Sequence, residues 1–109
     1  MSYKIRVPRK IKIGGHWVSI FYEPMLMDNH GKMGQSRFPE CEIAIQERDA
    51  SESRRLHTLF HELMHWLDHT YNNYALEEAE VDAFASGIQT LLIDLGIEFD
   101  WSDIKELSL

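Results

Sequence analysis

Cysteine is nearly absent from this chain of 109 residues, because Cys41 is its only cysteine. A disulfide needs a pair of cysteines, and cysteine-built zinc sites need several thiolates. The chain can therefore form neither an intramolecular disulfide nor a zinc site of that kind. Any metal ion must be held by histidine, aspartate or glutamate.

Long apolar runs are also missing from the sequence. It contains no stretch of about 18 consecutive apolar residues, the length that a membrane-spanning helix needs. The first segment, residues 1–12, lacks the apolar run of a signal peptide. We therefore expect a soluble, cytoplasmic protein with no membrane partner.

Basic residues are scarce outside the N-terminal segment. The formal net charge is −7 at pH 7. Residues 1–12 contain no acid but hold these basic side chains: Lys4, Arg6, Arg9, Lys10 and Lys12. Short basic segments of this kind are more often exposed, solubilising strands than binding sites. Because the acidic remainder would repel a phosphate backbone, nucleic-acid binding is disfavoured.

The chain is long enough for one domain, residues 1–109, with one hydrophobic core. Its first part, residues 1–48, is mainly of β character. Residues 10–23 predict a hairpin that turns at Gly14 and Gly15. Residues 33–38 and 41–46 predict a second strand pair, with a loop at residues 25–32 before it.

Residues 50–95 have the apolar period of helices. A first helix follows Asp49, with Ser51 or Asp49 at its start, and ends near Asn72. A second helix is expected at residues 76–95, stopped by Gly96. Its apolar side comprises Val81, Phe84, Ile88, Leu91, Leu92 and Leu95.

Residues 100–107 are predicted to form a short closing helix. The expected fold class is therefore α+β, with a small antiparallel sheet followed by two long helices and this short C-terminal helix.

The motif that carries chemistry is HExxH, formed by His61, Glu62 and His65 within the first helix. Helical residues at this spacing share a face and lie about 6 Å apart along the axis, so both imidazoles can reach one ion. Glu62 is rotated by about 100° from His61, which suits it to hold a water rather than to ligate the ion. Zinc with an adjacent carboxylate is the arrangement that metal-assisted hydrolysis needs. We predict Zn²⁺ as cofactor, both histidines as ligands and Glu62 as general base, against the alternative of ordinary surface histidines.

Further histidines extend the row along this helix. His57 and His65 are separated by about 12 Å of helical rise, which is too far for His57, His61 and His65 all to bind one ion. We expect His57 and His69 to support the ligands or to be exposed, and His16 and His30 to be surface residues.

The third ligand is expected from the start of the second helix. Glu78 and Asp82 share one face of that helix, so Glu78 can complete the metal site while Asp82 accepts the spare N–H of a ligand histidine. Asp82, Glu77 and Glu80 are the alternatives for the ligand. Acids here would also complement the helix dipole without any metal.

HELMHWLDH followed by EEAEVDAFASGIQTLL resembles the gluzincin pattern, in particular ImmA/IrrE-type metallopeptidases and the small zincin-like proteins of phages and prophages. The resemblance is closest over residues 56–92. It implies a minimal zincin-like fold, zinc held by His61, His65 and Glu78, Glu62 as catalytic base, and a peptide bond as substrate. It also implies that residues 41–46 are the sheet edge that pairs with an extended substrate.

Two functions compete. The first is a zinc-dependent endopeptidase acting on a peptide or protein, and the second is a non-catalytic zinc-containing interaction or adaptor domain. The presence of Glu62 favours the enzyme, because a structural zinc site has no use for that carboxylate. A chain this short leaves little material for the far wall of a protease cleft, which a partner or a second copy in a homo-oligomer could supply. Tyr71, Tyr74 and His57 are the candidates for stabilising an oxyanion.

Overall fold

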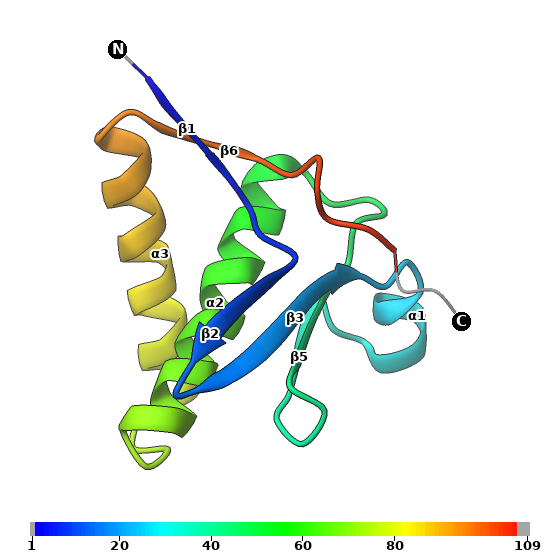
Figure 1. The fold of residues 1–109 in the computed structure, drawn as a ribbon, viewed down its shortest axis with the longest axis vertical. Coiled ribbons are helices and arrows are strands. Elements are labelled where there is room, and N and C mark those ends of the chain that lie inside the picture. Colours follow the sequence, from blue (N-terminus) through cyan, green and yellow to red (C-terminus); the bar gives the residue numbers. More distant parts are fainter. Residues whose placement is uncertain (1, 107–109) are drawn as a thin grey trace.

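The computed structural model describes residues 2–106, and the chain folds as α+β, as predicted (Figure 1). Its elements in order are β1 (Tyr3–Arg6), β2 (Lys10–Ile13), β3 (His16–Tyr22), α1 (Leu26–His30), β4 (Gly34–Arg37), β5 (Glu42–Ile45), α2 (Glu52–Tyr71), α3 (Glu78–Asp94) and β6 (Ile97–Asp100). Helix α2 lies between the main sheet and α3.

The main sheet has the strand order β2-β3-β5-β4. The β2–β3 hairpin and the β4–β5 pair are antiparallel, as predicted. The sheet that was expected to be antiparallel is mixed, because β3 and β5 pair in parallel. The segment between β3 and β4, which holds the short helix α1 where a loop was expected, carries the chain past the position that β5 then fills.

This topology also corrects the expected substrate edge. Strand β5 is hydrogen-bonded on both sides, to β3 and to β4, and cannot accept another strand. The edge strand on that side of the sheet is β4. Burial is consistent with β4, rather than β5, at the edge of the sheet. Ile43, Ala44 and Ile45 of β5 are completely buried, whereas β4 is only half-buried.

Helix α2 begins where the capping pattern predicts. Ser51 adopts an extended conformation and its hydroxyl accepts a hydrogen bond from the Arg54 backbone N–H at 3.2 Å. Leu56, Leu59 and Trp66 point from α2 into the core beneath the sheet. Glu62, on the same helix, is buried as well.

Helix α3 packs on α2, but half of its predicted apolar side is exposed. Val81 is buried, whereas Phe84, Leu91 and Leu95 expose 53%, 64% and 67% of their surface. The apolar stripe of α3 is therefore only partly buried within residues 2–106. Among those residues, no helix combines the length and the apolar character required to cross a membrane.

The predicted helix at residues 100–107 does not form in the described part, which ends at residue 106. Asp100 closes β6, and β6 pairs in parallel with β1. Residues 101–106 make a turn and a bridge between Glu106 and Tyr22. Trp101 and Ile104 are buried in the core, so tertiary packing, rather than helical periodicity, determines this segment. Residue 107 lies outside the described residues.

Candidate metal centre

The two histidines of the HExxH motif face one another on α2. The Nε2 atoms of His61 and His65 are 3.1 Å apart. Their rings are tilted by 67°, with centroids 4.8 Å apart. Such separations follow directly from helical spacing, which places both rings on one face of the helix.

Glu78, the first residue of α3, joins this pair. Its Oε1 lies 2.8 Å from His61 Nε2, and its Oε2 lies 3.2 Å from His65 Nε2. Among the competing acids, Glu77 and Glu80 are occupied in the capping box that begins α3. The structure thus brings together the three residues predicted as ligands.

A loop anchored by Asp68 sets the position of Glu78. Asp68 is buried, and its carboxylate accepts hydrogen bonds from the Leu76 backbone N–H at 3.2 Å and from Asn72 Nδ2 at 3.1 Å. The Asp68 carbonyl also accepts from the Tyr74 N–H. These bonds hold the turn between α2 and α3 and so direct Glu78 toward the histidines.

The donor set fits a metal ion. One ligand atom from each of His61, His65 and Glu78 lies within 4.8 Å of the others. Ligand atoms about 2.0–2.1 Å from a tetrahedral zinc are about 3.3 Å from one another. The two Nε2 atoms, 3.1 Å apart, are close to that value, and each lies 2.8–3.2 Å from one of the two Glu78 oxygens. This group could hold a metal ion.

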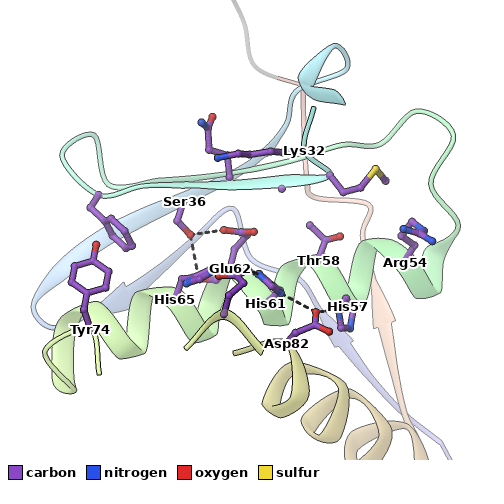
Figure 2. Close-up of a pocket in the computed structure, with 15 residues that line it drawn as sticks. Lys32, Ser36, Arg54, His57, Thr58, His61, Glu62, His65, Tyr74 and Asp82 are labelled. Atoms are coloured by element: carbon purple, nitrogen blue, oxygen red, sulfur yellow. Dashed lines mark hydrogen bonds and ion pairs between the residues drawn. The ribbon is translucent and has the colours of Figure 1, made fainter. Parts of the chain in front are cut away.

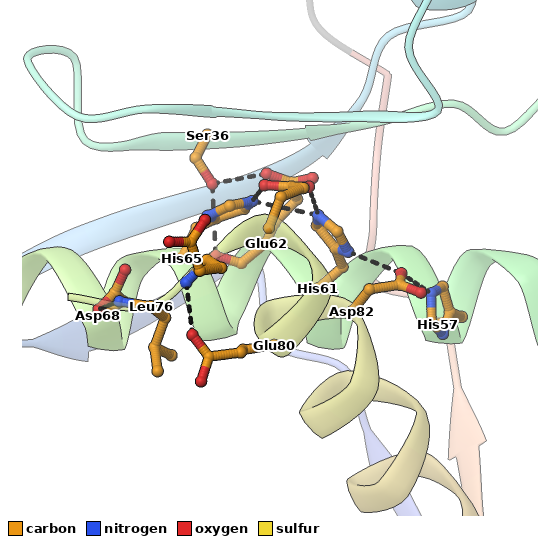
Figure 3. Close-up of polar contacts among 11 residues, drawn as sticks. Ser36, His57, His61, Glu62, His65, Asp68, Leu76, Glu80 and Asp82 are labelled. Atoms are coloured by element: carbon orange, nitrogen blue, oxygen red, sulfur yellow. Dashed lines mark hydrogen bonds and ion pairs between the residues drawn. The ribbon is translucent and has the colours of Figure 1, made fainter. Parts of the chain in front are cut away.

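Asp82 lies on the opposite side of His61 from Glu78. Its Oδ1 is 3.2 Å from His61 Nδ1 and 3.0 Å from His57 Nε2 (Figure 3). Hydrogen bonds to His57 and His61 lower the pKa of the Asp82 carboxyl. His61 thus contacts Glu78 through Nε2 and Asp82 through Nδ1, which fits a ligand histidine whose spare N–H is held by a carboxylate.

His57, His61 and Asp82 form a second group with metal-ligand spacing. It shares His61 with the first group but uses the other ring nitrogen. His57 therefore contacts Asp82, which in turn contacts His61, and its supporting role stays a prediction. His69 instead stacks on Phe38, with ring centroids 4.1 Å apart, and His16 and His30 are exposed.

Glu62 lies beside the ligands but makes a separate contact. Its Oε1 accepts a hydrogen bond from the Ser36 hydroxyl at 2.7 Å. Gly34 on β4 leaves room for it, because a Cβ there would lie 3.0 Å from Glu62 Oε2 and 2.4 Å from Thr58 Cγ2. Sequence reasoning missed Ser36 and Gly34, since both reach the site from a strand distant in the chain.

These residues line a cleft of about 770 Å³ between β4 and α2 (Figure 2). The HExxH face of α2 forms its floor and Glu78 and Asp82 close one side. Tyr74 and His57 also line it, whereas Tyr71 lies elsewhere, where its hydroxyl accepts from the Gly14 N–H. Among the oxyanion candidates, the structure therefore keeps Tyr74 and His57 near the site.

No protein-family model, curated protein or solved structure matches the chain.

Proposed function

We propose that this chain is a zinc-dependent peptidase, in which His61, His65 and Glu78 hold the metal and Glu62 is the general base. The single observation that carries the proposal is a buried carboxylate, that of Glu62, directly beside a convergent donor set. A carboxylate is costly to bury unless it has a partner or a task. The resemblance to gluzincins supports the same assignment.

Zinc is the metal that best suits this set of two imidazoles and one carboxylate, and when bound it supplies Lewis acidity toward a carbonyl oxygen and a water. Asp82 holds the His61 ring by its Nδ1–H, which leaves the Nε2 lone pair for the metal. A structural site would be closed by a fourth protein ligand. Among residues 2–106, this donor group has three members.

Glu62 performs the proton transfers. Ser36 occupies Oε1, so Oε2 is the oxygen that takes the proton of the attacking water. The protonated carboxyl then delivers it to the amide nitrogen as the peptide bond breaks. The Ser36 hydrogen bond holds the Glu62 carboxylate by Oε1 and leaves Oε2, on the side of Gly34, free for this role among residues 2–106.

The edge strand β4 makes a peptide the best-fitting substrate class. It forms the wall of the cleft and has no strand partner beyond it among residues 2–106. An extended peptide can add to such an edge through backbone hydrogen bonds, which places its carbonyl groups along the cleft.

The substitution Glu62→Gln tests the proposal. It removes the base but no ligand, so the zinc content and the thermal unfolding midpoint should match those of wild type while peptide hydrolysis falls by about 100-fold or more. Hydrolysis is measured on denatured casein by the release of new amino termini, with Glu98→Gln, an exposed glutamate on β6, as control. Equal activity of the Glu62→Gln and wild-type proteins contradicts the assignment.

A further inference from the structure

The cleft has two chemically different ends. In Figure 2, Tyr74 lies at one end and Arg54 and His57 lie at the other, with the HExxH side chains between them. An extended peptide that occupies the cleft must therefore pass from one environment to the other.

The first end is aromatic. The rings of Phe38 and Tyr74 meet edge to face with centroids 5.6 Å apart, and Phe38 also packs on Trp66 at 4.8 Å. Tyr74 has a positive φ of 59° and is 54% exposed. A bulky residue adopts that backbone conformation only when its surroundings impose it. The ring is thus held as a preformed apolar surface open to the cleft.

The second end is cationic. Arg54 lies at this end of the cleft and Lys32 lies over its middle, and both are exposed (Figure 2). Among residues 2–106, neither side chain forms an ion pair, whereas Arg6 pairs with Asp103 and Arg37 with Glu23. Two cations without carboxylate partners, in a chain of net charge −7, favour an anionic group from a ligand.

Helical geometry gives the spacing. Arg54 precedes His61 by seven residues on α2, a rise of about 10 Å. An extended peptide covers that length in about three residues. Strand β4 runs in the same direction as α2, since Gly34 faces Thr58 while Phe38, just beyond the strand, faces Trp66. Antiparallel pairing with β4, the slightly more stable mode, would direct a peptide from the aromatic end to the cationic end.

We propose that the cleft selects extended peptides by two side chains, an inference that rests on the proposed peptidase function. An aromatic or large aliphatic side chain comes before the residue at the metal centre. An acidic side chain follows that residue by about three positions. Phe38 and Tyr74 contact the apolar side chain. Arg54 pairs with the acid.

Binding to the Glu62→Gln protein, with and without added zinc, tests this selectivity separately from hydrolysis. The probes are fluorescein-labelled peptides of Gly and Ser that carry Phe and, four positions later, Glu, together with versions in which Lys replaces Glu, Ala replaces Phe, or the order is reversed. Fluorescence anisotropy should show the Phe-then-Glu peptide binding about 5-fold more tightly than each variant peptide.

Protein variants test which end of the cleft gives each peptide preference. Arg54→Glu should invert the preference to the Lys peptide, and Tyr74→Ala should remove the preference for Phe but keep that for Glu. Lys105→Glu makes the same charge change at an exposed position outside the cleft. It should change neither the preference for Phe nor the preference for Glu. Far-ultraviolet circular dichroism checks that each variant is folded, with Arg54→Gln as the milder substitution.

Equal binding of all the peptides, or a Glu preference that survives Arg54→Glu, overturns the inference. Selective binding to Glu62→Gln without any cleavage by the wild-type protein would instead support the cleft assignment and reject the peptidase function, so the two failures are distinguishable.

Discussion

Helices α2 and α3 contribute to the candidate metal centre in opposite ways. On α2, the side chains of His61 and His65 expose only 17% and 24% of their surface, and the helix packs against the sheet. On α3, the Glu78 side chain exposes 70%. The histidine pair is set by spacing within one helix, whereas Glu78 depends on how a turn docks a second helix. The α2 half is therefore preformed, and the α3 half is the one that substitutions can disturb without unfolding the core.

Removal of the α3 ligand should have the largest effect. Glu78→Ala should lower zinc affinity by more than the roughly 100-fold that the loss of a supporting residue causes. Competition titration with a chromogenic chelator measures the affinity. Glu77→Ala and Glu80→Ala break the capping box that begins α3 but remove no ligand, so each should lower the affinity far less than Glu78→Ala.

The supporting carboxylate of α3 should have an intermediate effect. Asp82→Ala frees the Nδ1 side of His61 and should lower zinc affinity by about 10- to 100-fold. Asp94→Ala removes an exposed aspartate from the other end of α3 and should have no effect on the same titration. If Asp82→Ala proves more damaging than Glu78→Ala, the roles of the two carboxylates must be exchanged.

The smallest effect is expected from removal of the Ser36 hydroxyl, which reaches from β4 to Glu62 on α2. Ser36→Ala leaves a buried carboxylate without its donor and should lower the free energy of unfolding by about 1–2 kcal/mol while zinc affinity is retained. Urea denaturation measures the difference against Thr90→Ala, an exposed hydroxyl on α3. An unchanged urea midpoint for Ser36→Ala would show that Ser36 does not stabilise the Glu62 carboxylate.

The same contrast explains what could be predicted from sequence. The pairing of His61 with His65 and the Ser51 cap depend on residues within one turn, so local spacing was sufficient. Glu78 and Asp82 were identified because they share a face of α3, although their approach to α2 depends on Asp68. That anchoring role has no local signal.

Features that depend on distant pairing could not be predicted. Ser36 and Gly34 meet Glu62 only because β4 lies over α2, and the position of β5 inside the sheet depends on a parallel pairing with β3. The segment after Asp100 has a helical pattern, yet burial of Trp101 and pairing of β6 with β1 outweigh it. Tertiary contacts override weak local propensity in each case.

Metal analysis of the purified protein tests the central claim most directly. After incubation with zinc and removal of the excess by gel filtration, mass spectrometry of the metal content should find about one zinc per wild-type chain and almost none in His61→Ala or His65→Ala, as expected for a single three-residue site. Folded wild-type protein that retains no zinc would contradict the account.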